Sequence, residues 1–223
     1  MLEFNKEEKN LIQKLNTPAK VQSFLNKLEF NFEEPARNAS SIASAGGDGE
    51  TAKSPILTLR TGKAHCFEGA LLGAYILSQH GFKPLILHLK TTKNDFDHTI
   101  ALFKIDGLWG ALSKTNHAVL RFREPIYKNI HELVMSYFHE YFLDNGKKTL
   151  RQYSRPLNLN IFEKGWEKED GNLWGIDDEL DEIRHYDILS ARAIKNLRKA
   201  DKIEIQAGKI VEYRKLSRGA LDN

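Results

Sequence analysis

The sequence predicts an α+β fold in which a buried helix packs on an antiparallel sheet. Residues 65–79 (HCFEGALLGAYILSQ) carry apolar side chains on most faces, which is typical of a helix enclosed by the rest of the molecule. Residues 84–89, 98–104 and 108–113 have the composition of consecutive strands. The Asp106-Gly107 pair between the last two is a strong signal for a two-residue hairpin turn. The helix and the hairpin form the predicted core.

The N-terminal segment predicts a pair of short helices. Apolar residues recur at helical spacing over residues 5–30, and Thr17-Pro18 marks the start of the second helix. Residues 36–54 are small and polar, which favours a loop. We therefore expect a single domain over residues 1–223. It would consist of an N-terminal helical segment (1–35), a core (about 55–120) and a C-terminal extension (121–223).

The C-terminal extension predicts further helices. Residues 129–142 carry a broad apolar stripe, and residues 177–198 have an acidic start and a basic end that complement a helix dipole. Residues 150–175 are expected to be irregular. Residues 202–216 are expected to form a small hairpin that turns at Ala207-Gly208.

The composition limits the possible functions. The 223 residues are 41% hydrophobic, and 33 basic against 30 acidic side chains give a formal net charge of +3. This charge is too small to indicate nucleic-acid binding. No stretch approaches the roughly 18 apolar residues of a membrane span, and a single cysteine excludes an intrachain disulfide. We expect a cytoplasmic protein with no membrane or nucleic-acid partner.

Cys66 is the candidate nucleophile because it stands at the start of the predicted buried helix. The free N–H groups and the positive dipole end of a helix favour a thiolate over a thiol. The same N–H groups can hold the oxyanion that forms when a thiolate attacks a carbonyl. The small residues Gly69, Ala70 and Gly73 allow strands to pack closely on the helix.

His98, which opens the first strand of the hairpin, is the candidate base. A two-residue turn at Asp106-Gly107 places the end of the next strand, Ser113 to Asn116, beside the imidazole. Asn116 is the first candidate for the residue that orients the ring, because an amide oxygen can accept a hydrogen bond from the ring N–H. Ser113 is the second and weaker candidate.

Three other residues are candidates for substrate binding, each with a structural alternative. His65 would tune the thiolate or contact substrate, or else cap the helix. Trp109 would be a substrate platform or a core residue. His117 would line the cleft or lie in a loop. The spacing of the histidines does not match a zinc motif, and a thiolate-rich metal site is excluded, so neither a metal nor a cofactor is expected.

The runs GKAHCFEGALLGAYILSQHGFKP and DHTIALFKIDGLWGALSKTNH resemble the core of the transglutaminase-like superfamily. The resemblance covers roughly residues 56–120, and the following segment is similar to bacterial members of that superfamily. It implies a papain-like α+β fold with a Cys–His–acid triad and assigns Cys66 and His98 to it. The position that the family fills with an acid, four residues after Trp109, is Ser113 here.

The resemblance and the residues together predict cysteine-dependent acyl transfer or amide hydrolysis through a thioester. The substrate would be a peptide, a protein or a small amide. The alternative is a catalytically inactive binding module on the same scaffold. The reason for this alternative is that a serine stands at the position of the acid. A Cys66 sulfur beside a His98 ring nitrogen, with a side-chain oxygen behind the ring, would favour the enzyme.

Overall fold

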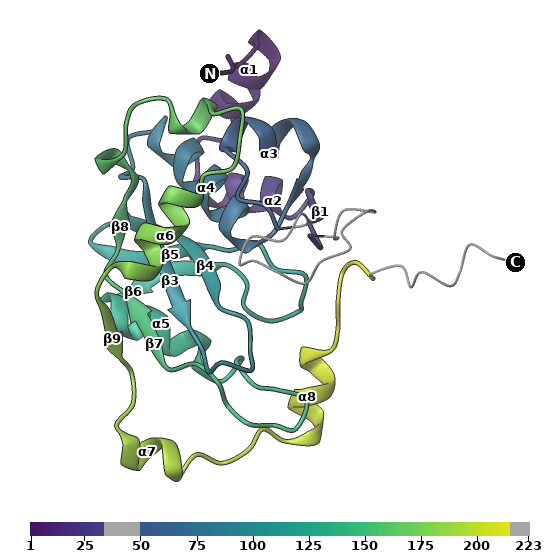
Figure 1. Cartoon of the computed structure of the whole chain (residues 1–223), viewed down its shortest axis with the longest axis vertical. Coiled ribbons are helices and arrows are strands. Elements are labelled where there is room, and N and C mark those ends of the chain that lie inside the picture. The colour runs from purple at the N-terminus through teal and green to yellow at the C-terminus, as the bar shows by residue number, and fades with distance from the viewer. Residues whose placement is uncertain (34–49, 215–223) are drawn as a thin grey trace, which may run out of the picture.

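The computed structural model describes residues 1–33 and 50–214 and has an α+β fold. Within these residues, a seven-stranded antiparallel sheet has the order β6-β5-β4-β3-β7-β9, with β8 also paired to β3 (Figure 1). Its strands are β3 (Leu85–Lys90), β4 (His98–Ile105), β5 (Leu108–Leu112), β6 (Arg123–Tyr127), β7 (Gln152–Ser154), β8 (Leu157–Asn158) and β9 (His185–Asp187).

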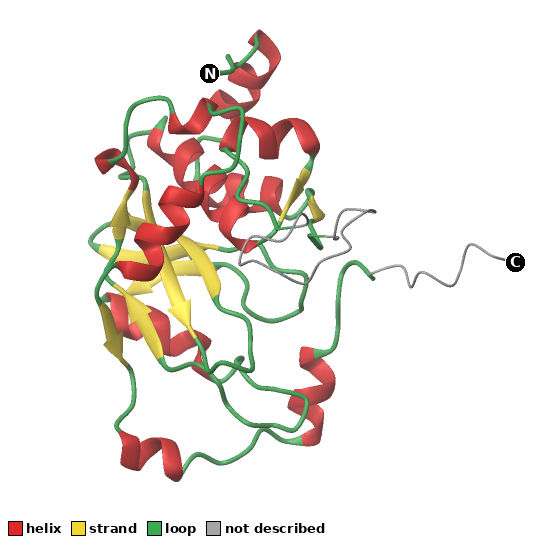
Figure 2. Ribbon diagram, in the orientation of Figure 1, coloured by secondary structure: helices red, strands yellow, loops and turns green. Residues whose placement is uncertain are grey.

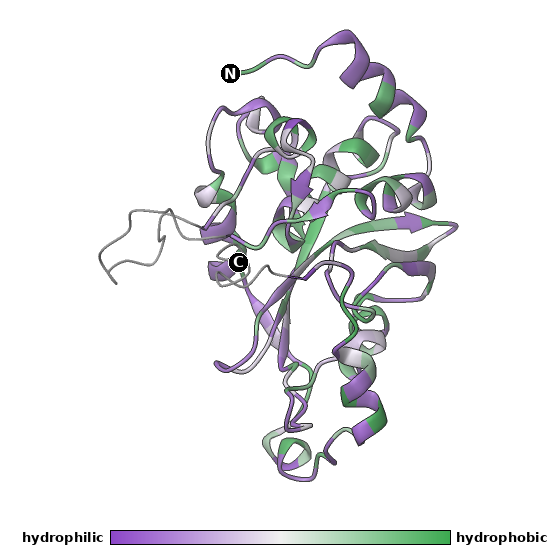
Figure 3. Ribbon diagram, turned by 90° about the vertical axis from the view of Figure 1, so that its right-hand side faces the viewer, coloured by the Kyte–Doolittle hydropathy of each residue, from purple (hydrophilic) through white to green (hydrophobic). Residues whose placement is uncertain are grey.

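Helix α4 (Cys66–Ser78) confirms the predicted buried helix. Its apolar side chains meet Ile86, Ala101 and Leu112 on one face of the sheet. A Cβ at Gly69 would lie 2.4 Å from Cβ of Lys114, so the glycine allows the helix to approach the end of β5 closely. Hydrophobic residues, green in Figure 3, gather where the helices meet the sheet.

The two N-terminal helices are α1 (Lys6–Lys14) and α2 (Pro18–Leu25), as the sequence predicted. The Thr17 hydroxyl caps α2, and Pro18 occupies its first turn. The short helix α3 (Pro55–Thr61) was not predicted, although Ser54 caps it in the same way. Strands β1 (Glu29–Phe30) and β2 (Lys63–Ala64) pair in parallel, and β2 leads directly into α4.

The predicted hairpin has the expected register. Ile105 pairs with Leu108, and Asp106 and Gly107 have φ values of 50° and 83°, as a two-residue turn with two left-handed positions requires. The pairing of β4 with β5 ends at Ala101–Leu112, one residue before Ser113. Residues 113–116 have left the sheet, and this affects which of them reaches His98.

The opposite face of the sheet is covered by α5 (Ile130–Phe138), which is shorter than the predicted helix over 129–142. Its buried side chains pack with Leu87, Leu89, Ile100 and Leu102 of the sheet. The sheet therefore lies between two layers of helices, with α1 to α4 on one side and α5 on the other (Figure 2).

The C-terminal predictions need correction. The segment predicted to be irregular, 150–175, contains β7, β8 and the 3-10 turns η1 (Leu159–Ile161) and η2 (Trp166–Lys168). The predicted helix over 177–198 is broken: α6 (Trp174–Glu182) ends, β9 joins the sheet, and α7 (Ala191–Lys195) follows.

The predicted hairpin over 202–216 is wrong, because residues 202–208 form helix α8 (Lys202–Gly208). Asp201 and Glu204 form a capping box that starts this helix, and a hairpin would leave both side chains without those contacts. Of the predicted loop over 36–54, residues 36–49 lie outside the described part of the chain, as do residues 215 and 216 of the hairpin prediction.

Candidate active site

Cys66 is the first residue of α4, at the position where a helix has unpaired N–H groups. Burial alone would raise the pKa of its thiol. Hydrogen bonds from His65 and His98 to the sulfur, together with the charges of these rings, hold the pKa well below its ordinary value. The structure therefore brings Cys66 and His98 together and gives the sulfur the electrostatic surroundings of a thiolate.

Ser113 is the residue behind the His98 ring. Its Oγ lies 2.7 Å from Nε2 of His98 and 2.5 Å from the carbonyl oxygen of Leu120. Because a carbonyl can only accept, the Ser113 hydroxyl donates to Leu120 and its oxygen accepts the Nε2–H of His98. Nδ1 is then the His98 nitrogen that remains for the Cys66 proton. This order, sulfur then imidazole then an oriented acceptor, is that of a catalytic triad.

Gln22 of α2 holds Ser113 in place. Its side-chain Oε1 accepts from the Ser113 N–H at 2.9 Å, and its Nε2 donates to the Ser113 carbonyl at 2.8 Å. The amide thus pairs with the backbone as a neighbouring strand would, at the point where β5 has ended. Gln22 is buried, so this pairing is shielded from water. No sequence motif pointed to Gln22, which is 91 residues away from its partner.

His65, directly before Cys66, is the second imidazole at the sulfur. Its Nε2 lies 2.7 Å from the carbonyl oxygen of Thr51, and the carboxylates of Glu33 and Glu68 are 3.3 and 3.6 Å from the same nitrogen. Burial would lower the pKa of His65, but the hydrogen bond and charge of Cys66 and the two carboxylates raise it to about 9. His65 is therefore a cation at neutral pH and forms an ion pair with the thiolate.

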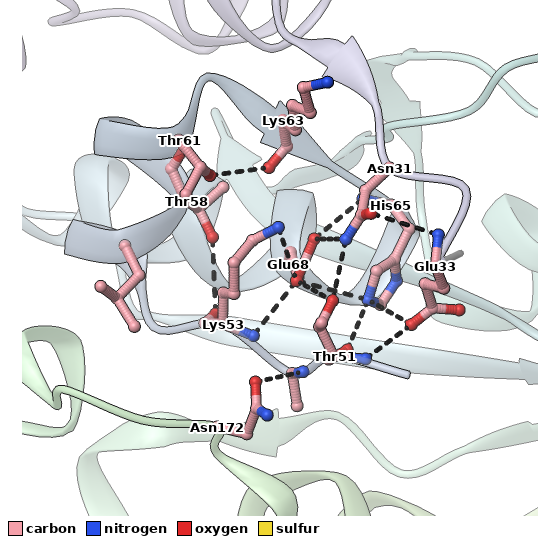
Figure 4. A network of polar contacts seen from close by, with 12 residues as sticks. Asn31, Glu33, Thr51, Lys53, Thr58, Thr61, Lys63, His65, Glu68 and Asn172 are labelled. Carbon is pink, nitrogen blue, oxygen red and sulfur yellow. Dashed lines mark hydrogen bonds and ion pairs between the residues drawn. The ribbon is translucent and has the colours of Figure 1, made fainter. Parts of the chain in front are cut away.

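Glu68 organises the polar network beside His65 (Figure 4). Its side chain has no exposed surface and accepts hydrogen bonds from the Thr51 hydroxyl at 2.7 Å and the Asn31 amide at 3.1 Å. It also accepts from the His65 N–H and forms an ion pair with Lys53 at 3.2 Å. The buried carboxylate joins two segments of the chain, at Asn31 and at residues 51–53, to the start of α4, which fixes the position of Cys66.

Two residues predicted near the site lie against the C-terminal segment instead. The Asn116 side chain donates to the carbonyl of Tyr213 at 2.9 Å and accepts from its N–H at 2.8 Å, so the contact with His98 expected for Asn116 is made by Ser113. His117 is exposed, and its Nδ1 lies 2.9 Å from the Gly208 carbonyl. Neither residue belongs to the Cys66–His98 pair, because both contact the segment between the end of α8 and Tyr213.

Trp109 lies at the other end of the hairpin, paired with Lys104 beside the turn. Lys104 stands over its indole ring, 5.0 Å from the ring centre. Lys104 follows His98 by six positions along β4, which amounts to about 20 Å along a strand. The structure therefore does not bring Trp109 to Cys66, and the core role is the one that its surroundings support.

A cluster of titratable groups beside the site escaped the sequence analysis. His88 contacts Asp97 at 3.2 Å and Asp181 at 3.5 Å, and its Nδ1 lies 3.2 Å from Nε2 of His185. Burial, followed by the charge of Asp181, raises the pKa of Asp177 to about 6, and the charge of Cys66 adds to this rise. These residues come from β3, the β3–β4 loop, α6 and β9, so no local pattern could have joined them.

Comparisons with known proteins give similarities to solved structures but none to a family model or a curated sequence. No family model matches the sequence, and no curated protein matches it. Among solved structures, Legionella pneumophila LapG is similar over 50% of this chain and 66% of its own chain. The TM-score is 0.33 and the sequence identity is 17%, so the similarity describes only a part of the fold.

Two further properties concern residues 1–33 and 50–214. No group of three or more His, Cys, Asp or Glu side chains in these ranges is placed to hold a metal ion. In the same ranges, every helix is too short or too polar to cross a membrane.

Proposed function

We propose that the protein is a transglutaminase-like cysteine enzyme that hydrolyses an amide or peptide bond, or transfers its acyl group, through a thioester on Cys66. One arrangement carries the proposal. The Cys66 sulfur lies at a helix start and accepts hydrogen bonds from two imidazoles, and Ser113 orients one of these, that of His98. A structural cysteine has no need for such partners.

The chemistry follows from the contacts of each group. The Cys66 thiolate attacks the carbonyl carbon, and the electron pair of the carbonyl bond moves to oxygen. The tetrahedral intermediate collapses to a thioester when the leaving amine takes the proton held on Nδ1 of His98. Water or an amine then attacks the thioester and returns its proton to His98. N–H groups at the start of α4 stabilise the oxyanion.

The sequence pattern supports the family assignment within this proposal. Cys66, His98 and Ser113 occupy the positions of the family's cysteine, histidine and acid, and it is Ser113 that contacts the imidazole. A hydroxyl orients the ring as a carboxylate would but does not neutralise an imidazolium. His65, with its positive charge, stabilises the thiolate from the other side. In this proposal the Cys66 thiolate is stabilised by two histidines, His98 and His65.

The decisive experiment is labelling with electrophilic peptide and amide probes, read by intact-mass spectrometry. The parent protein is compared with Cys66→Ala and His98→Ala. We expect one covalent adduct on the parent, no adduct on Cys66→Ala and strongly slowed labelling of His98→Ala. Equal labelling of all three proteins would exclude the enzyme. Adding a primary amine or water alone then separates transfer from hydrolysis through the mass of the released product.

The neutral Ser113 favours a second candidate, a binding module for a peptide or small ligand. In such a module the cleft would hold its ligand without forming a thioester. Cys66→Ala would then retain the affinity of the parent for the peptide, and the parent would react with acyl probes no faster than a free thiol with a pKa of about 8.5. Calorimetric titration of both proteins with the unreactive peptide tests this alternative.

A further inference from the structure

Tyr141 carries a buried hydroxyl that the mechanism above does not use. It follows α5, its side chain is 3% exposed, and its carbonyl accepts from the Thr149 N–H at 3.1 Å. The ring packs in the same hydrophobic cluster as Leu89 and Ile100 of the sheet. Thr149 also accepts from the Thr92 N–H, just beyond β3, at 3.0 Å, and Leu89 near that end of β3 pairs with His98; Tyr141 therefore lies at the end of the sheet that presents the catalytic histidine.

The Tyr141 hydroxyl has no hydrogen-bond partner. In residues 1–33 and 50–214, it is the one buried side-chain nitrogen or oxygen that lacks a partner. Leaving such a group unpaired costs about 1–3 kcal/mol, so native proteins seldom keep one without a reason. Tyr137, one turn earlier and also buried, shows the ordinary arrangement, because its hydroxyl donates to the Arg121 carbonyl at 3.1 Å.

The unpaired hydroxyl lies within electrostatic range of the nucleophile. Burial raises the pKa of Tyr141 well above its ordinary value, and the negative charges of Cys66, Asp95 and Asp97 raise it further. The phenol therefore keeps its proton and remains a donor. The hydroxyl makes no hydrogen bond to the sulfur, so its interaction with the Cys66 charge acts through space.

We propose that the Tyr141 hydroxyl is an oxyanion donor, whose partner is the acyl oxygen of the substrate. The inference rests on the proposed function. When the Cys66 sulfur bonds to the carbonyl carbon, the negative charge moves to an oxygen attached to that carbon. The Tyr141 O–H donates a hydrogen bond to this oxygen without transferring its proton, and the bond is lost when the carbonyl re-forms in the thioester. A donor that is unpaired in the free enzyme loses no hydrogen bond when it binds the oxyanion, so its hydrogen bond stabilises the transition state most.

The test compares two reactions at Cys66 that differ in whether an oxyanion forms. Iodoacetamide alkylates the sulfur by displacement at a saturated carbon, without an oxyanion. A p-nitrophenyl ester acylates the sulfur through a tetrahedral oxyanion and releases nitrophenolate. For Tyr141→Phe we expect unchanged alkylation and acylation slowed by about 10²- to 10³-fold. The thermal midpoint should stay equal or rise, because the variant removes a buried polar group without a partner.

Tyr137→Phe is the matched control, since it deletes a buried hydroxyl that has a partner. It should lower the thermal midpoint and leave both reactions unchanged. Equal acylation of the parent and Tyr141→Phe would overturn the inference while leaving the proposed function intact. Equal loss of alkylation and acylation in Tyr141→Phe would also overturn it, because the defect would then lie in the thiolate. A parent protein that the ester does not acylate at Cys66 would overturn both proposals.

Discussion

The Ser113 hydroxyl oxygen lies 2.7 Å from Nε2 of His98 and thereby selects which ring nitrogen carries the proton. The Leu120 carbonyl forces this choice, since it takes the only hydrogen that Ser113 can donate. We expect Ser113→Ala to lower the acylation rate about tenfold or more, because the ring loses its oriented tautomer. The measurement is the nitrophenolate burst from an ester probe, with iodoacetamide alkylation as a reference for the thiolate.

Asn116→Ala is the control for that experiment. Its amide contacts Tyr213 rather than His98, so the variant should acylate at the parent rate. The assignment of Ser113 would be wrong if Asn116→Ala slowed acylation more than Ser113→Ala did.

His65 should set the pH range over which Cys66 is reactive. The pKa of His65 is raised from 6.5 to about 9, so its charge persists through neutral pH and is lost as the pH rises through about 9. The stability that this raised pKa contributes to the folded state is fully present below pH 6.5 and is lost as the pH rises through about 9. We expect His65→Gln to move the onset of Cys66 alkylation to higher pH, measured with iodoacetamide between pH 4 and 10.

His117→Gln provides the matched change, since His117 is exposed and contacts the Gly208 carbonyl. It should leave the alkylation profile unchanged. An identical profile for His65→Gln and the parent would show that His65 does not stabilise the thiolate.

Glu68 should matter chiefly for stability. Glu68→Ala removes a carboxylate that pairs with Lys53 and accepts from Thr51 and Asn31 in a site without exposed surface. Breaking a buried pair from one side typically costs about 3–5 kcal/mol. We expect a loss of free energy of unfolding of that order, measured by urea denaturation.

The surface ion pair between Glu29 and Lys63, at 2.9 Å, is the reference for Glu68. Glu29→Ala should cost less than about 1 kcal/mol, because both side chains are largely exposed. Similar losses for the two variants would contradict the role given to the buried network.

Gly69 should resist substitution for a steric reason. A Cβ at this position would lie 2.4 Å from Cβ of Lys114, and neither group can move without separating α4 from the end of β5. We expect Gly69→Ala to lower the free energy of unfolding by about 1–3 kcal/mol, as overpacking does. Gly175→Ala in α6, where nothing lies within 4 Å of the added methyl, should instead stabilise by about 0.5–1 kcal/mol.

Local patterns predicted the parts of the fold that depend on local physics. The burial of α4, the turn at Asp106-Gly107 and the register of the hairpin all follow from side-chain periodicity and turn chemistry. The missed helices α3 and α8 had local signals too, in Ser54-Pro55 and in the capping box of Asp201 and Glu204. The β-branched residues in 202–212 favoured strands. The capping contacts at the start of this segment stabilise a helix instead.

The part of the site that was predicted is the part that one local sequence motif describes. Cys66 and His98 lie together, but extending the hairpin register past Leu112 placed residues 113–116 beside the ring, and the amide of Asn116 was preferred as an acceptor to the hydroxyl of Ser113. The ladder stops there because Gln22 pairs with the Ser113 backbone and the loop returns through Leu120, whose φ is 60°. Contacts between segments 91 residues apart leave no trace in local spacing, which is also why Gln22 and the His88 cluster were missed.

The pairing of Asn116 with Tyr213 has a consequence for biosynthesis. The partner of Asn116 is translated 97 residues later, and at 5–20 residues per second this amounts to a delay of about 5–20 s. During that interval a nascent chain holds Cys66, His98 and Ser113, while both hydrogen bonds between the Asn116 side chain and Tyr213 are still missing. The loop that carries Ser113 and Asn116 therefore acquires its last backbone partner among the described residues only after residue 213 has been synthesised.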